Sequence, residues 1–192
     1  VQMIRSGDVI PKIHKVIQPS DKPNMPENMA ELKWNDTNVD LILKNIQDNS
    51  DVQEKKILAF FESLGVEGLG KGNVRKIIKT GFDTLEKILS MSVDDFLLVD
   101  GFKDKMANKI FNSIHNKVDK ANLIKIMTAS NIFGRGMGGK RLTAILQAYP
   151  NILIKKRSRQ DILDLISKID GFGSKTATTF VNNIPAFKNF LR

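Results

Sequence analysis

The sequence has 192 residues, 41% of them hydrophobic, which allows one large domain or two small ones with a buried core. It has no cysteine, which excludes disulfides and thiolate zinc sites, and no apolar run near the roughly 18 residues of a membrane span. The net charge of +9 lies entirely in residues 119–192, where 13 Lys and Arg outnumber 4 Asp and Glu. Such a basic surface indicates either a polyanion partner or a solvated face without a partner.

The first 50 residues read as short strands separated by a linker. Residues 1–17 alternate apolar and polar side chains around a Ser-Gly-Asp turn, which predicts two strands. Three of the six prolines fall in residues 18–26, which predicts an irregular connection. Residues 31–43, "ELKWNDTNVDLIL", predict a small hairpin that turns at Asn-Asp-Thr-Asn. From residue 51 to the end the apolar pattern is helical.

The helical part contains four similar stretches, each centred on a turn. The first turn residues follow one another at intervals of 33, 35 and 35 residues, and they are Gly68, Gly101, Gly136 and Gly171. An apolar residue comes next in every copy, glycine or lysine stands two positions on, and apolar residues recur six and nine positions on. Four copies at nearly constant spacing predict four repeats of one structural unit.

Each repeat predicts a helix, a tight turn and a second helix. Glycine allows backbone angles that other residues avoid and lets a ligand approach the main chain. The first N–H groups of the second helix have no partner within it, so they can hold an anion such as a phosphate. The pattern resembles the helix-hairpin-helix motif. That resemblance implies sequence-independent binding of duplex DNA through main-chain amides.

We therefore predict DNA-binding residues at the turns and in the first residues after them. Nearby lysines and arginines would add affinity by releasing counterions. The predicted set in the helical part is Gly68, Gly70, Lys71, Lys105, Arg135, Gly136, Gly138, Gly139, Lys140, Arg141, Gly171, Gly173, Ser174, Lys175 and Thr176. We favour DNA contact for the third and fourth repeats. In the second, where Lys103 replaces a glycine between Asp100 and Asp104, packing alone is an equal alternative.

Two flanking signatures narrow the class of protein. "RSGDVIPKI" (5–13) resembles the end of the OB-fold domain of NAD-dependent DNA ligases, and "KILAFFESLGVEGLGKGNVRKII" (56–78) resembles the entry to that family's helix-hairpin-helix domain. The order of OB-fold end, connector and four hairpins matches the family along the whole chain. One feature departs from it, because family members usually carry a four-cysteine zinc finger where this chain has residues 18–50. The hairpin around Trp34 would be a zinc-free remnant, in a divergent ligase of the kind found in large DNA viruses.

The resemblance implies a mainly α fold, a tandem helix-hairpin-helix array of four repeats with a short N-terminal β segment from an OB-fold end. The expected parts are residues 1–17 (OB-fold end), 18–50 (connector) and 51–192 (array). The parent ligase would seal nicks in DNA replication and repair, with NAD and Mg²⁺ as cofactors. This part would bind nicked duplex DNA on the minor-groove side, beside the remaining OB and nucleotidyltransferase domains. Arg5 and Lys12 would lie near the DNA backbone.

The stretch "KIDG" at 168–171 resembles the ligase motif whose lysine accepts the nucleotide. A nucleophile lysine would be followed by several hundred residues of further motifs, whereas the 21 residues after Gly171 are predicted to form a helix, so we expect no nucleotide site here. The second repeat has "VDGF" where the fourth has "IDGF", so the Asp-Gly pair belongs to the turn pattern. Lys168 is therefore expected to end a helix. We predict no catalytic residue, no metal site and no bound cofactor in this segment, and His14 and His115 are too isolated to hold a metal.

Other hypotheses remain open. The chain could be a free-standing DNA-binding subunit of a junction-binding or nuclease complex, or a helical protein-interaction array whose glycines only make turns. The basic run at 154–161 is either a solvated loop or a phosphate contact. The valine start suggests a fragment of a longer chain. Because no basic-then-apolar leader or membrane span is evident, we expect an intracellular location, in the cytoplasm or nucleoid, or in a viral factory if the source is a virus.

Overall fold

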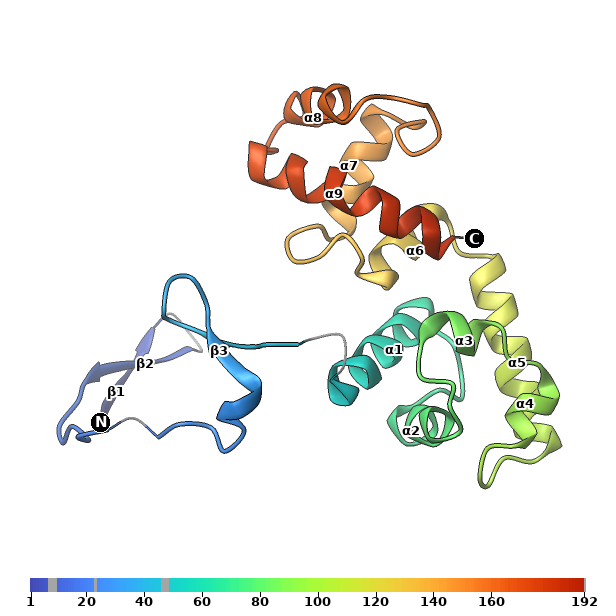
Figure 1. The fold of residues 1–192 in the computed structure, drawn as a ribbon, viewed down its shortest axis with the longest axis horizontal. Coiled ribbons are helices and arrows are strands. Elements are labelled where there is room, and N and C mark those ends of the chain that lie inside the picture. The colour runs from blue at the N-terminus through green and yellow to red at the C-terminus, as the bar shows by residue number, and fades with distance from the viewer. Residues whose placement is uncertain (7–9, 23, 46–48, 192) are drawn as a thin grey trace. The chain divides into compact units, whose positions relative to one another are not determined.

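The chain divides into a small β unit, residues 1–46, and a helical unit, residues 47–192 (Figure 1). The structure is a computed structural model, and it describes residues 1–6, 10–22, 24–45 and 49–191. No helix within these ranges is long and apolar enough to cross a membrane. The predicted mainly α fold with a short N-terminal β segment is confirmed.

The first predicted strand pair is present. β1 (Gln2–Ser6) pairs antiparallel with β2 (Ile10–Lys15), and the Ser-Gly-Asp turn expected between them extends outside the described residues. The apolar side chains of this pair are exposed, as Ile10 at 69% and Ile13 at 56% illustrate. The assignment of this ribbon to an OB-fold end stays a prediction.

The second predicted hairpin is also present. β3 (Leu32–Trp34) follows the short 3₁₀ helix η1 (Met29–Glu31) and pairs with β4 (Leu41–Leu43). Asn35 stabilises the turn through two hydrogen bonds. Its side-chain oxygen accepts from the Val39 backbone amide at 3.1 Å, and its backbone amide donates to the Asp40 carbonyl at 2.8 Å. Trp34 is 46% exposed, so the polar contacts of Asn35, more than burial of the tryptophan, fix this hairpin.

The described helical unit contains four helical hairpins and one extra short helix. The hairpins pair α1 with α2, α4 with α5, α6 with α7 and α8 with α9, and α3 lies in the connection between the first two (Figure 1). The bounds are α1 (Ser50–Leu64), α2 (Lys71–Lys79), α3 (Leu85–Leu89), α4 (Val93–Leu97), α5 (Asp104–Asp119), α6 (Leu123–Ser130), α7 (Gly139–Ala148), α8 (Arg159–Ser167) and α9 (Ser174–Phe190).

The repeated apolar positions form the cores of the array. The residue after the first turn glycine is buried in every repeat, at Leu69, Phe102, Met137 and Phe172. The residues six and nine positions after that glycine have no exposed surface, and they are Val74, Ala107, Leu142, Ala177, Ile77, Ile110, Ile145 and Phe180. The predicted repeat pattern is therefore confirmed, because each repeat buries the same set of positions.

These residues gather into two clusters, one for each pair of hairpins. The first extends from Ile57 to Ile114 and adds Ala129, and the second extends from Met127 to Phe187. Phe190 packs against both clusters. The Lys125 ammonium adds a long hydrogen bond of 3.4 Å to the Leu64 carbonyl, between α6 and the end of α1. The array is thus built as two hairpin pairs in contact.

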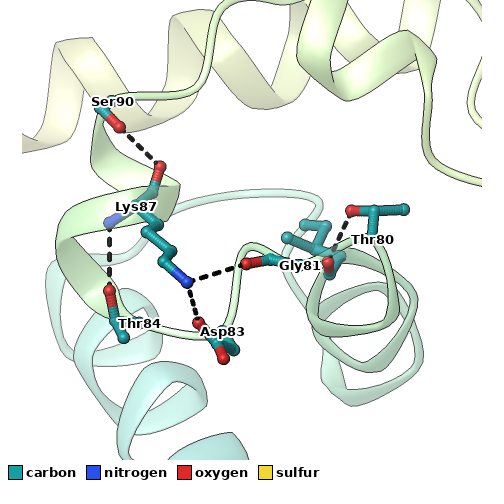
Figure 2. A network of polar contacts seen from close by, with 7 residues as sticks. Thr80, Gly81, Asp83, Thr84, Lys87 and Ser90 are labelled. Atoms are coloured by element: carbon teal, nitrogen blue, oxygen red, sulfur yellow. Dashed lines mark hydrogen bonds and ion pairs between the residues drawn. The ribbon is translucent and has the colours of Figure 1, made fainter.

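A polar network fixes the connection between the first two hairpins (Figure 2). The Lys87 ammonium donates to the Asp83 carboxylate at 2.7 Å and to the Gly81 carbonyl at 3.2 Å. The hydrogen bond from Lys87 holds the pKa of Asp83 below its usual value. Thr84 caps α3, and Ser90 ends it by donating to the Lys87 carbonyl. These contacts hold the chain segment that leads from α2 into the second hairpin.

Ile145→Ala should lower the free energy of unfolding by about 2–5 kcal/mol, because it leaves a cavity in the second cluster. Chemical denaturation followed by circular dichroism measures this. Ile154→Ala is the matched control: Ile154 is 80% exposed, so its truncation should change stability by less than about 0.5 kcal/mol. Equal losses of stability in the two variants would contradict the assignment to the core of the residue nine positions after the turn glycine.

Candidate nucleic-acid interface

The two glycine positions of the repeated turn have different requirements. The first has a left-handed backbone in all four repeats, with φ of +86° at Gly68 and Gly136 and +76° at Gly101 and Gly171. Side chains strain such a backbone, so glycine is needed there for its conformation. The second position is extended, with φ between −121° and −73°, which any residue adopts. Lys103 can therefore replace glycine at the second position without strain.

The second position matters because it is the N-cap of the following helix. The five α-helices that do not follow a repeated turn are α1, α3, α4, α6 and α8. Each receives a side-chain cap at its N-terminus, from Asn49, Thr84, Ser92, Asn122 and Ser158 respectively. The N-caps of the second helices of the four hairpins are Gly70, Lys103, Gly138 and Gly173. Within the described contacts none of these four residues gives its helix a side-chain cap. The first amides of α2, α5, α7 and α9 are thus left for an external acceptor.

The number of open amides differs between hairpins. In α2 the Asn73 amide donates to the Gly70 carbonyl at 3.0 Å, and in α7 the Arg141 amide donates to the Gly138 carbonyl at 3.0 Å. In α9 the first such bond within the described contacts comes from Ala177, which leaves the amides of residues 174–176 open. The fourth hairpin therefore offers the widest main-chain site for an anion.

The first two hairpins pack their turns against each other's helices. A Cβ built on Gly68 would lie 2.8 Å from the Ile110 side chain of α5. Beside it the Glu67 amide donates to the Ser113 hydroxyl at 2.8 Å, and Lys109 forms an ion pair with Glu67 at 3.1 Å. In return, the Lys76 ammonium of α2 donates to the Asp100 carbonyl of the second turn at 3.1 Å. Two acidic residues, Glu67 and Asp100, thus stand directly before the turn glycines Gly68 and Gly101 of the first two hairpins.

The third and fourth hairpins share a cationic hollow. It encloses about 160 Å³ and is lined by Arg135, Arg141 and Lys175 together with Thr176 and Thr179. The Arg141 guanidinium donates to the Gly136 carbonyl at 2.6 Å, so its charge is held at the third turn. The structure thus brings together three predicted cations from two repeats.

The same positions of the first hairpin pair carry less positive charge. Glu67, Asn73 and Lys105 occupy the places that Arg135, Arg141 and Lys175 occupy in the second pair. The first set sums to no net charge and the second to +3. Phosphates bound at the third and fourth turns would therefore meet the stronger attraction. The sequence-based preference for these two repeats rests on the same charges.

The remaining predicted residues of the array lie at the helix starts. Lys71, Lys105 and Lys140 are exposed in the first turns of α2, α5 and α7. Gly139 is half-buried, and a Cβ built on it would lie 3.5 Å from the Thr128 hydroxyl. Arg75, which sequence reasoning did not single out, binds Glu54 of α1 at 2.7 Å and so joins the helices of the first hairpin. The hydrogen bond that the Arg75 guanidinium donates to the Glu54 carboxylate raises the pKa of Arg75.

Arg5 and Lys12 lie in the other unit, on neighbouring strands. Arg5 is opposite Pro11, and Lys12 is opposite Ile4. Opposed residues of a strand pair point to the same face, and successive residues alternate, so Arg5 and Lys12 point to opposite faces of the ribbon. Their predicted role at the DNA backbone remains untested, and the ribbon does not gather the two charges on one face.

Lys168 is the C-cap of α8, as the turn pattern predicts for "KIDG". Its side chain is exposed, and the next turn begins at Gly171. Within the described ranges no three His, Cys, Asp or Glu residues are grouped closely enough to hold a metal ion.

Four paired turns with uncapped helix starts define a tandem helix-hairpin-helix array. Comparison with known families supports this: residues 60–116 match the model of the SAM-like helix-hairpin-helix tandem. Comparison with curated proteins finds relatives named DNA ligase along the entire chain. Both matches agree with the resemblance that the sequence suggested, which was to a C-terminal segment of a DNA ligase.

The relatives include viral and bacterial proteins. The DNA ligase of Acanthamoeba polyphaga mimivirus is 37% identical over 194 residues, the putative DNA ligase 205R of Invertebrate iridescent virus 6 is 30% identical over 196, and the DNA ligase of Desulfatibacillum aliphaticivorans is 31% identical over 198. Each match covers the whole chain and 30% of the relative. The chain therefore spans about a third of the length of these relatives.

Gly68→Ala and Gly70→Ala separate the two glycine roles. Gly68→Ala should cost at least about 1–2 kcal/mol of folding stability, because alanine is strained at this positive φ and its Cβ meets Ile110. Gly70→Ala should change stability by about 1 kcal/mol at most, because its backbone is extended and no described atom lies within 4 Å of the new Cβ. Thermal unfolding of both variants measures this, and a larger loss in Gly70→Ala would contradict it.

Proposed function

We propose that this segment is the DNA-gripping portion of an NAD-dependent DNA ligase and holds nicked duplex DNA by its phosphates. One observation carries the proposal: the α-helices that follow the glycine turns lack side-chain caps, whereas the other described α-helices have them. A helix N-terminus with free amides is a ready site for a phosphate. The names of the relatives supply the enzyme class.

In this proposal main-chain amides bind the DNA phosphates directly, and cationic side chains strengthen the binding. The amides of residues 174–176, and those that open α2 and α7, would bind phosphate oxygens. Arg135, Arg141 and Lys175 would add charge around the same oxygens. Phosphate contacts position a protein on DNA and carry no sequence information, so binding would be independent of sequence. For the segment alone we expect a Kd of about 10⁻⁶ M or weaker at physiological salt, the non-specific range.

The minor-groove side is the proposed face for the hairpins, with the N-terminal ribbon as the end of an OB-fold. Nick sealing in replication and repair would be the work of the parent ligase. NAD and Mg²⁺ would be held by residues of its nucleotidyltransferase domain, and this segment would supply position and orientation. An intracellular site of action, and a viral origin like that of several relatives, belong to the same proposal.

A substitution series at Gly173 tests the main-chain grip. Gly173→Asp should leave the stability within about 0.5 kcal/mol or raise it, because aspartate is a good N-cap and the extended backbone accepts a side chain. The same carboxylate would occupy the open amides and repel a phosphate. DNA affinity should therefore fall at least tenfold, measured by fluorescence anisotropy with a nicked duplex.

Two variants at the same residue serve as controls. Gly173→Asn caps the helix without a charge, so it should weaken DNA binding less than Gly173→Asp. Gly173→Ala has no acceptor and should bind within about threefold of the native chain, since no described atom lies within 4 Å of its Cβ. If all three variants bound DNA as tightly as the native chain, the fourth hairpin would serve only packing. Absence of DNA binding by the native chain at low salt would favour the protein-interaction array.

A further inference from the structure

A pocket lies beside the second half of α9, away from the turns. It encloses about 420 Å³, within the range of roughly 300–1,000 Å³ typical of ligand pockets. Three largely buried isoleucines line it, Ile152, Ile162 and Ile184. Five cationic side chains also line it, and they are Lys155, Lys156, Arg157, Arg159 and Lys188. No Asp or Glu of the described chain is among its lining residues.

The pocket is separate from the proposed phosphate site of the fourth hairpin. An α-helix rises 1.5 Å per residue, so Pro185 at the pocket lies about 16 Å along α9 from Ser174 at the turn. The Arg159 guanidinium donates to the Asn182 side-chain oxygen at 2.5 Å, which places the start of α8 beside the second half of α9. Turn and pocket therefore occupy opposite ends of the hairpin.

An anion in this pocket would meet side chains, since the start of α8 is already capped. The Ser158 hydroxyl accepts from the Asp161 amide at 3.0 Å, and the Asp161 carboxylate accepts from the Ser158 amide at 3.2 Å. Asp161 also attracts Arg157, but it does not line the pocket. Among the described contacts no ion pair occupies the five lining cations.

One main-chain acceptor beside the pocket lacks its usual helical donor. Pro185 has no N–H, so the Val181 carbonyl, four residues earlier, lacks the helical donor it would otherwise receive. Both residues line the pocket. A fitting ligand would thus combine anionic groups, an apolar group and an N–H donor. The sugar-phosphate backbone of a duplex has neither the apolar group nor the donor. An acidic peptide has all three.

We propose that this pocket binds an acidic peptide segment of a partner protein, with one large apolar side chain seated against the three isoleucines. Carboxylates on either side of that residue pair with the lysines and arginines, and a peptide N–H donates to the Val181 carbonyl. The basic run at 154–161 thereby becomes the rim of a protein-docking site, a function distinct from the DNA grip proposed for the turns.

Fluorescence anisotropy with a labelled ten-residue peptide, acidic throughout except for one central phenylalanine, tests this at about 50 mM salt, where charge contacts are weakly screened. Lys156→Glu/Lys188→Glu should weaken binding at least tenfold. Lys79→Glu/Lys120→Glu makes the same charge change at exposed residues away from the pocket and should change binding less than threefold. Replacing the peptide's phenylalanine by alanine should weaken binding to the native chain at least threefold.

A nicked duplex titrated in parallel separates this proposal from the DNA grip. DNA affinity should be equal in the two double variants and should fall with Gly173→Asp, which leaves peptide binding unchanged. Three results would overturn the docking site. They are an absence of saturable peptide binding to the native chain, equal loss of peptide binding in both double variants, and a loss of DNA binding specific to Lys156→Glu/Lys188→Glu, which would assign the pocket to DNA.

Discussion

The structure depends on the packing that holds four uncapped helix starts in place. The amides that open α2, α5, α7 and α9 receive no side-chain cap within the described residues, whereas the five other helices do. An uncapped start costs a helix about 1 kcal/mol relative to a good cap. The buried apolar residue after each turn glycine, together with the positions six and nine residues on, holds these starts in place by packing.

The two hairpin pairs repeat one architecture with different charges. In the first pair the turns are tied to neighbouring helices by Glu67 with Lys109 and by Lys76 with the Asp100 carbonyl. In the second pair the equivalent surface gathers Arg135, Arg141 and Lys175. The same packing therefore carries two different surfaces: the first pair is tied mainly to itself, and the second leaves its positive charge exposed. This division agrees with the basic excess of residues 119–192.

Much of this array could be predicted from the sequence, because each repeat is local. The interval between turn glycines and the apolar positions after them depend on backbone angles and helix periodicity, which act over a few residues. The difference between the two glycines could not be predicted: Gly171 is needed for its positive φ, whereas Gly173 is extended and leaves the amides accessible. Both are glycines in three repeats, and only Lys103 in the second repeat marks the second position as more tolerant.

Contacts that depend on how the chain folds back on itself were also beyond the sequence. Arg141 was predicted to contact DNA, and its bond to the Gly136 carbonyl, five residues earlier, depends on how the turn folds back. The pocket joins residues 152–162 with residues 181–188, so the basic run alone left solvated loop and phosphate contact equally open. The opposite orientations of Arg5 and Lys12 follow from strand register, which the spacing of the two residues does not fix.

Amide chemical shifts test the central claim most directly. When a nicked duplex is added to the ¹⁵N-labelled chain, the amides of Ser174, Lys175 and Thr176 and those that open α2 and α7 should shift in proportion to bound DNA. The amides that open the side-chain-capped helices α6 and α8 should stay unchanged. Shifts confined to the capped helices, or to the loop at 154–157, would contradict phosphate binding by the uncapped helix starts.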